Sequence, residues 1–182
     1  MAAGDPIDGG AGPDPVDAAI HGRRTHKVYG RDPVPRETLD ELFELARWAP
    51  NHRLTEPWRF RVVGPTALAA LKDAGSPSDA AKLDRAPTLV AASVLQTGPV
   101  DQRLEDVCAA SAAIYIVLLA AHARGLAGYW RTPAVLGSKN GRVALGIGDD
   151  EISLGLIHLG PVRQEAKPPA RRDASEVVSY LD

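Results

Sequence analysis

The amino-acid sequence predicts a mixed fold of the α+β or α/β type rather than a helical bundle. Helical and strand patterns alternate irregularly along the chain, and no repeat or linker divides it. Two apolar runs, residues 88–96 and 152–159, have the length of buried strands. Residues 100–124 instead form a run long enough for a helix that is apolar over most of its circumference. We expect a single domain over residues 14–182, preceded by a disordered lead-in over residues 1–13.

The N-terminal part of the expected domain combines a helix start with a basic segment. Asp14 and Pro15 favour a helix, because an aspartate can cap the first turn and proline fits its first position. This helix should end near Gly22. Residues 23–29 read R-R-T-H-K-V-Y and predict a basic, extended segment.

Two prolines delimit the second predicted helix, which begins at Pro35 and ends at Pro50. Acidic residues cluster in its first turns, where the helix dipole favours negative charge. Residues 59–63 alternate as a strand does, and residues 66–74 predict a short helix. The apolar stripe of the second helix consists of Leu39, Leu42, Phe43 and Ala46.

The long apolar helix dominates the second half of the chain. It should end at Gly125, and residues 128–133 then predict a short strand that opens into a turn. Residues 138–145 predict a short helix before the last buried strand. A helix that is apolar on nearly all sides must be covered by its own core or by a second subunit.

Composition narrows the class of protein. The formal net charge of -2 removes the main reason to expect nucleic-acid or membrane-surface binding. The longest uncharged apolar run, residues 107–121, is too short to span a bilayer comfortably, and no export signal is visible. Cys108 is the single cysteine, which excludes an intrachain disulfide, and its apolar helix predicts a buried, inert thiol. We therefore expect a cytoplasmic protein.

Several common catalytic motifs are absent from the sequence. It has no G-x-x-x-x-G-K-[ST] phosphate loop and no G-x-S-x-G nucleophile elbow. Residues 146–148 read G-I-G but lack the third glycine of a dinucleotide-binding turn. The five histidines are scattered and no cysteines are paired, so we expect no metal site.

Two groups of cationic residues remain as candidate binding residues. Arg23, Arg24 and Thr25 could hold a phosphate through guanidinium and hydroxyl groups, with Lys27 as a further cation. The alternative is a solvated basic turn after a helix. Residues 130–132, W-R-T, could stack on a ring and reach anionic or carbonyl oxygens. Their alternative is a core tryptophan beside a surface arginine.

Taken together, these motifs resemble the FMN-dependent nitroreductase family, in its short-chain NAD(P)H nitroreductase subgroup. The resemblance covers nearly the whole chain from Pro15 onwards, and the order and spacing of separate motifs make it specific. The motifs are R-R-T-H-K-V-Y at 23–29, P-V-P-R-E-T-L-D-E-L-F-E-L-A-R-W-A-P-N-H at 33–52, E-P-W-R-F-R-V-V at 56–63, G-L-A-G-Y-W-R-T-P at 125–133 and I-S-L-G-L-I-H-L-G-P at 152–161.

The resemblance implies an α+β fold, with a central mixed sheet wrapped by helices, and an interlocked homodimer. One FMN would lie in each of two clefts at the dimer interface. The long apolar helix would form much of the subunit contact, and residues 49–58 would cover the partner's flavin. Arg171 and Arg172 could add phosphate contacts, although a solvated tail is the better interpretation of that segment.

The resemblance also assigns roles to individual residues. Arg23, Arg24 and Thr25 would hold the FMN phosphate and ribityl end, and Lys27 would approach the pyrimidine edge. Residues from both subunits would contribute, and a nicotinamide region would lie at the end of the long helix. The remaining expected contacts are Trp48 and His52 from the other subunit, Trp130, Arg131 and Thr132 beside the isoalloxazine and its tail, and His122, Arg124 and Gly125 in the nicotinamide region.

The implied activity is hydride transfer through FMN. NADH or NADPH would be the donor, and a nitroaromatic, a quinone or a similar electron-poor compound the acceptor, in ping-pong order. The family pattern N-x-Q-P-W reads L-T-E-P-W here, so Leu54 and Glu56 lack the usual amides and substrate preference cannot be transferred. Two alternatives stay open: a protein that stores or senses FMN with little turnover, and a structural dimer without cofactor.

Overall fold

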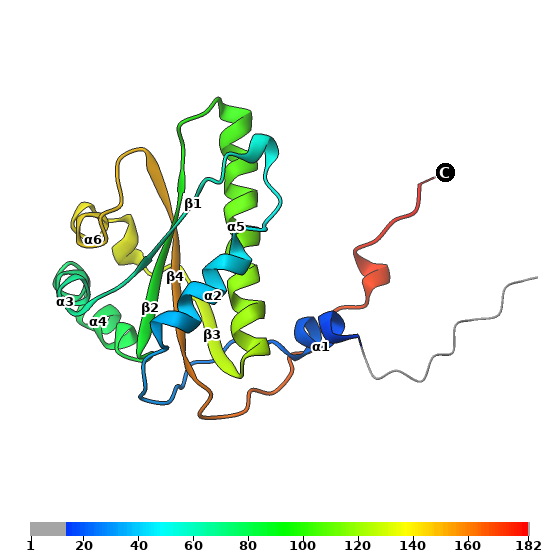
Figure 1. Ribbon diagram of the computed structural model, residues 1–182, viewed down its shortest axis with the longest axis horizontal. Coiled ribbons are helices and arrows are strands. Elements are labelled where there is room, and N and C mark those ends of the chain that lie inside the picture. The colour runs from blue at the N-terminus through cyan, green and yellow to red at the C-terminus, as the bar shows by residue number, and fades with distance from the viewer. Residues whose placement is uncertain (1–13, 182) are drawn as a thin grey trace, which may run out of the picture.

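A computed structural model describes residues 14–181, so the expected lead-in over residues 1–13 lies outside the described part of the chain. A four-stranded sheet stands between two layers of helices (Figure 1). The helices are α1 (Pro15–Gly22), α2 (Arg36–Ala46), α3 (Pro65–Asp73), α4 (Pro77–Leu83), α5 (Val100–Ala123) and α6 (Lys139–Ala144). The strands are β1 (Trp58–Val62), β2 (Thr88–Leu95), β3 (Leu126–Arg131) and β4 (Glu151–Pro161).

The sheet has the strand order β1-β2-β4-β3, and all pairings between these strands are antiparallel. The expected α+β class is therefore confirmed. A parallel element comes from the basic segment, because Thr25 forms an isolated parallel bridge with Gly128. Tyr29 forms a further antiparallel bridge with Val162, just after β4, so the basic segment is fixed to β3 at one point and to the end of β4 at another.

The core consists of two clusters, one on each face of the sheet. Side chains of α2 and α5 pack on one face, where Leu42, Val117 and Ile157 are fully buried. The other face is covered by α3, α4 and α6, with Leu71, Leu83 and Leu156 at its centre. Because β2 and β4 are buried on both faces, their sequences are apolar without alternation, as predicted.

The predicted helices and strands are present, although α2 ends at Ala46 rather than at Pro50. Helix α4 and three short 3-10 segments, His52–Leu54, Ala134–Gly137 and Ala174–Glu176, were not predicted. The sequence around α4, S-P-S-D, resembles a loop. It nevertheless carries a helix start signal: the Ser76 side chain accepts a hydrogen bond from the Asp79 backbone N–H, and Pro77 occupies the first turn. The seven-residue helix is too short for its apolar period to be visible in the sequence.

Helix α5 is only partly covered by its own chain. By length and composition it could cross a membrane, but half of its most apolar window is buried inside the fold, as in a core helix of a soluble protein. Its outer side leaves Val100 81% and Leu104 68% exposed. The prediction of a buried Cys108 is wrong: this thiol is exposed because it lies on the same uncovered side of the helix.

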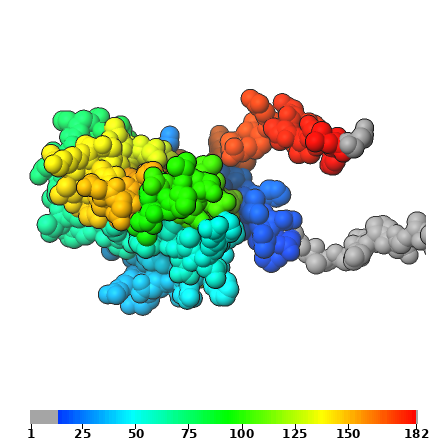
Figure 2. Space-filling view, turned by 90° about the horizontal axis from the view of Figure 1, so that it is seen from above, coloured from blue at the N-terminus to red at the C-terminus, as the bar shows by residue number. Residues whose placement is uncertain are grey.

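The two ends of the described chain lie together at one end of the molecule. Helix α1 and the C-terminal segment project from the body (Figure 2). Helix α1 has no buried residue, and Val16 on its surface is 63% exposed. In the C-terminal segment, Val177, Tyr180 and Leu181 are likewise exposed. Both segments therefore present apolar surface that the single chain does not bury.

Candidate functional site

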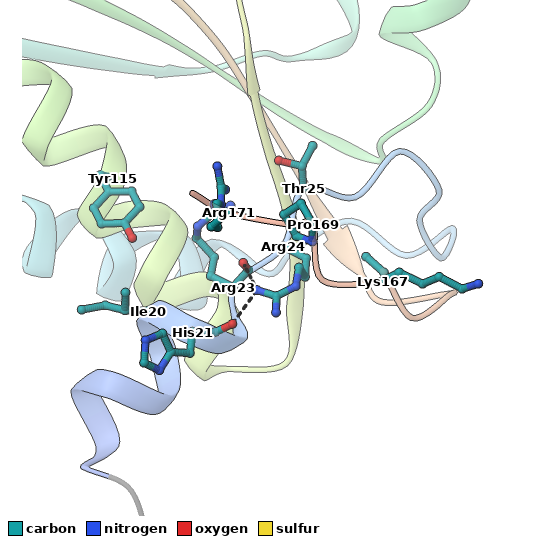
Figure 3. Close-up of a pocket in the computed structure, with 10 residues that line it drawn as sticks. Ile20, His21, Arg23, Arg24, Thr25, Tyr115, Lys167, Pro169 and Arg171 are labelled. Atoms are coloured by element: carbon teal, nitrogen blue, oxygen red, sulfur yellow. Dashed lines mark hydrogen bonds between the residues drawn. The ribbon is translucent and has the colours of Figure 1, made fainter. Parts of the chain in front are cut away.

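The predicted phosphate residues line a cavity of about 730 Å³. It lies where α1 ends, between α5 and the C-terminal segment (Figure 3). Arg171 lines this cavity and Arg172 does not, and both residues are exposed. The lining residues are Ile20, His21, Arg23, Arg24, Thr25, Tyr115, Ala166, Lys167, Pro169 and Arg171.

Local backbone structure presents these residues to the cavity. The Arg23 N–H donates to the Ala19 carbonyl and closes helix α1, after which the chain becomes extended. The His26 N–H donates to the Gly128 carbonyl at 3.1 Å and fixes the segment beside β3. The short segment from Arg23 to Thr25 is thus held at both ends, and its side chains project from a defined backbone.

Arg23 is placed as a ligand-binding arginine would be. Its guanidinium carbon lies 5.8 Å from the centroid of the Tyr115 ring, within cation–π range. Its Nε atom is buried and has no hydrogen-bond partner among the described residues. A buried guanidinium N–H without an acceptor is costly, so this atom fits an anionic ligand in the cavity.

The charge of this cavity is uniformly positive. Arg24 donates to the backbone carbonyl of Arg23 at 2.9 Å, and so stays folded against the segment. In the described part of the chain, no salt bridge involves Arg23, Arg24 or Arg171. Arg24 also donates to the His21 carbonyl in the last turn of α1, so the interpretation as a basic turn after a helix still fits Arg24. Arg23 differs, because it is half-buried and its Nε atom has no acceptor within residues 14–181.

The three residues of the expected nicotinamide region have different surroundings. His122 faces the phosphate cluster, and burial together with Arg23, His26 and Arg24 lowers its pKa. The Arg124 Nε atom instead donates to Glu41 on α2 at 3.0 Å. Gly125, with φ +71°, ends helix α5 in a conformation that favours glycine.

A second, much smaller cavity of about 10 Å³ brings Lys27 and Arg131 together on the α4 face of the sheet. Such a volume holds about one water-sized group. His158 is only 2% exposed, and its Nε2 atom has no hydrogen-bond partner within residues 14–181. The residues that line this cavity are Lys27, Tyr29, Lys82, Arg85, Tyr129, Arg131 and His158.

Burial controls the protonation of both buried rings here. Burial, together with the charges of Arg131 and Arg85, lowers the pKa of His158 to about 4, so the imidazole is neutral at pH 7. Burial, and secondarily Tyr129, raises the pKa of Tyr29, whose hydroxyl donates to the His26 carbonyl at 2.7 Å. Neither ring therefore supplies a negative charge that would neutralise the cations lining the small cavity.

The side chains of the W-R-T triplet point in different directions, because neighbouring residues of a strand alternate between faces. Trp130 packs against the cluster on the α2 and α5 face, and Arg131 lines the small cavity on the opposite face. The Trp130 Nε1–H donates to the Leu154 carbonyl at 2.8 Å. Thr132 is exposed and borders a separate open cavity of about 330 Å³.

The residues of the polar loop over 49–58 line neither of the two cationic cavities. Trp48, just before it, is 77% exposed. The His52 Nδ1 atom lies 2.7 Å from a Glu105 carboxylate oxygen, beside an open groove of about 560 Å³ along α5. Leu54 and Glu56 have positive φ values of 51° and 43°, which are uncommon for residues with side chains.

Several residues of the two cavities escape prediction from the sequence. In the sequence, Tyr115 looks like one more residue of a long apolar helix. The helical period nevertheless places it on a different face from the core residues. Lys82 and Arg85 lie near the unpredicted helix α4, and no local pattern connects them to Lys27. Their contribution depends on tertiary packing alone.

Comparison with known proteins gives a consistent assignment. The model of the Nitroreductase family matches residues 20–160 of this chain. The proposed NAD(P)H nitroreductase YfhC of Bacillus subtilis is 27% identical over 157 residues, which make up 78% of this chain and 81% of YfhC.

Solved structures share the fold at lower identity. The nitroreductase-like family protein from Bacillus cereus superposes with a TM-score of 0.84 at 21% identity, over 94% of this chain and 98% of that chain. A proposed nitroreductase from Desulfovibrio desulfuricans, solved in complex with FMN, has a TM-score of 0.80 at 23% identity, over 94% and 99% of the two chains. Both similarities support the fold.

The buried imidazole predicts how stability depends on pH. Between pH 6.5 and pH 4 the unfolded chain protonates His158 and the folded chain does not. The free energy of unfolding should therefore fall by up to about 3 kcal/mol as the pH decreases through this window. Urea unfolding of the wild type and of His158→Gln at several pH values measures the effect. The variant should lose much less stability over the window, and an equal loss in the wild type and the variant would contradict the assignment to His158.

Proposed function

Because the chain belongs to the nitroreductase family, we propose that it is an FMN-dependent oxidoreductase. NADH or NADPH would donate hydride, and a nitroaromatic, a quinone or a similar electron-poor acceptor would be reduced in ping-pong order. The observation that carries the proposal is the cavity in which Arg23, Arg24 and Arg171 converge without any carboxylate partner among residues 14–181. The redox chemistry would be supplied by bound FMN, and the protein would bind and orient it.

The cationic cavity would hold the phosphate. Arg23 supplies a buried Nε–H without an acceptor, and its ring contact with Tyr115 fixes the guanidinium plane. Thr25 adds a hydroxyl donor, and Arg171 reaches the same cavity from the C-terminal segment. Charge-assisted hydrogen bonds of this kind are the strongest that side chains make to phosphate, so this cavity would provide much of the binding free energy.

The small cavity would serve the pyrimidine edge of the flavin. Lys27 follows Thr25 by two residues on the same extended segment, so the proposed phosphate and ring contacts share one backbone. Arg131 meets Lys27 in that cavity, together with Lys82 and Arg85. These cations would stabilise negative charge that develops on the ring during reduction. Thr132 would border the ring from the end of β3.

A homodimer would complete the site. His52 lines the open groove along α5 together with Leu104 and Cys108, and Trp48 is exposed, whereas neither residue lines the cationic cavities of its own chain. In the dimer they would approach the partner's flavin, and Val100 and Leu104 would be buried between the subunits. His122, Arg124 and Gly125 stay the proposed nicotinamide region. We place this chemistry in the cytoplasm.

A second candidate function is storage or sensing of FMN with little turnover. It is favoured by Leu54 and Glu56, which replace the amides of the family pattern. Leu54 is 79% exposed on the loop and offers no hydrogen bond to a flavin or substrate. The acceptor side of the site would then be impaired while the phosphate cavity stayed intact.

The first prediction concerns the phosphate cavity. Arg23→Ala combined with Arg24→Ala should raise the Kd for FMN at least about 100-fold, because two charge-assisted contacts vanish. Affinity for riboflavin, which has no phosphate, should stay close to that of the wild type. Equilibrium dialysis with both flavins measures this. The control Arg36→Ala with Arg47→Ala removes two solvent-exposed arginines of α2 and should leave FMN affinity unchanged. Unchanged FMN affinity in the first variant would contradict the assignment.

The second prediction separates the two candidate functions. Anaerobic addition of NADH or NADPH to the FMN-loaded protein should bleach the flavin absorbance within seconds to minutes, because an oxidoreductase accepts hydride directly. Adding a quinone afterwards should restore the oxidised spectrum. Stopped-flow absorbance measures both half-reactions. Flavin that stays oxidised with both nicotinamides would favour the storage or sensor function instead.

The third prediction concerns the dimer. Leu104→Lys should shift the protein to a monomer and weaken FMN retention, because a charge cannot be buried on the apolar side of α5 without a partner. Light scattering and flavin stoichiometry measure the two effects. Val143→Lys places the same change on α6, where Val143 is 70% exposed, and should leave both properties intact. A dimeric, fully loaded Leu104→Lys protein would locate the interface elsewhere.

A further inference from the structure

Strand β4 contains a bulge next to the end of β3. On β2, Ala92 pairs with Gly155 and Ser93 pairs with Ser153, so Leu154 is an extra residue without a partner on β2. A bulge frees a backbone group from the ladder and often aims a side chain near a functional site. Here the freed group is the Leu154 carbonyl, which accepts the Trp130 Nε1–H at 2.8 Å.

Gly155 is required for this arrangement. Its φ of +137° lies outside the range that residues with side chains adopt readily. A Cβ atom at this position would lie 2.5 Å from the Arg131 carbonyl oxygen and 2.7 Å from Trp130 Nε1. The indole and the end of β3 therefore occupy the space that any other residue at position 155 would fill.

The Trp130 ring is thus held in a single orientation. An indole has one N–H donor, and the Leu154 carbonyl satisfies it. One side of the ring packs against the core cluster of α2 and α5, yet the residue is only partly buried. The part that stays accessible is rigid, because rotation of the ring would break the hydrogen bond and the core contact together.

This rigid ring stands close to the proposed phosphate cavity. Thr25, which lines that cavity, pairs with Gly128, and Trp130 follows Gly128 by two strand residues, or roughly 7 Å. Such a separation is comparable to the length of a ribityl chain. A flavin anchored by its phosphate at Arg23 would therefore bring its ring system to the end of β3. There Lys27 and Arg131 would meet its pyrimidine edge from the α4 face, and Trp130 would meet the ring from the α2 and α5 face.

We propose that the bulge at Leu154 and Gly155 is a positioning device, which fixes the Trp130 indole as a rigid wall for the isoalloxazine ring. Gly155 is a positioning residue in this scheme, and it acts through Trp130. The inference rests on the proposed function. The proposal gives the bulge a function. A tryptophan that rotated freely would allow the bound flavin ring to tilt, and hydride transfer depends on the orientation of that ring.

The test removes the hydrogen bond and keeps the ring. In the FMN-loaded protein, Trp130 is replaced by β-(3-benzothienyl)alanine, in which sulfur stands in place of the indole N–H, and in parallel Trp130→Phe is prepared. Flavin occupancy should stay near that of the wild type, because the phosphate anchors the cofactor. The visible circular dichroism band of the bound flavin should weaken, and the rate constant of its reduction by NADPH should fall about 3- to 10-fold, as expected for one neutral hydrogen bond.

Phe60→Leu is the matched control. Phe60 packs against the same core cluster from β1 and stacks on Phe43 at 5.3 Å, so this variant loosens the core without touching the bulge. Its flavin dichroism and reduction rate should equal those of the wild type. Unchanged dichroism and rate in both Trp130 variants would overturn the proposal, as would equal losses in Phe60→Leu. A wild-type protein that does not retain FMN would overturn the proposed function instead.

Discussion

The pairing of the basic segment with strand β3 is the constraint on which the candidate site depends. Thr25 bridges Gly128 on β3 and Tyr29 bridges Val162 just after β4, so the segment is fixed to the sheet at two points. Side chains before Thr25 reach the cavity beside α5, and Lys27 reaches the small cavity on the α4 face. Without this pairing, the same cations would be a mobile, fully hydrated turn with no fixed geometry towards any ligand.

Holding so many cations together is unfavourable for the chain alone. Arg23 keeps a buried N–H without an acceptor, and His122 and His158 both have lowered pKa values because arginines surround them and burial disfavours their charged forms. An anionic ligand would relieve this repulsion and satisfy the free donors. Ligand binding and folding stability are then linked, since a ligand that binds only the folded chain stabilises it. If FMN binds in these cavities as proposed, it should therefore raise the stability of the fold.

Much of the fold, but less of the site, could be predicted from the sequence. Proline and aspartate signals at Asp14, Pro15 and Pro35 locate two helices, and long apolar runs locate β2, β4 and α5. The guanidinium pair at Arg23 and Arg24 was also identified. Lys82 and Arg85 could not be, because only tertiary packing brings them to Lys27. The bulge at Leu154 leaves no pattern in an apolar strand, and the exposure of Cys108 depends on how much of α5 a single chain covers.

The uncovered side of α5 connects assembly with chemistry. Leu104 and Cys108 lie on that side beside His52, whereas the cationic cavities open on other parts of the same chain. His52 lies beside Glu105 on α5, whereas Arg23 closes the end of α1. None of the residues of the loop over 49–58 lines either cationic cavity of its own chain. If they act on a flavin at all, it must be one held by a second copy of the chain, and dimerisation is then a condition for activity rather than a source of stability alone.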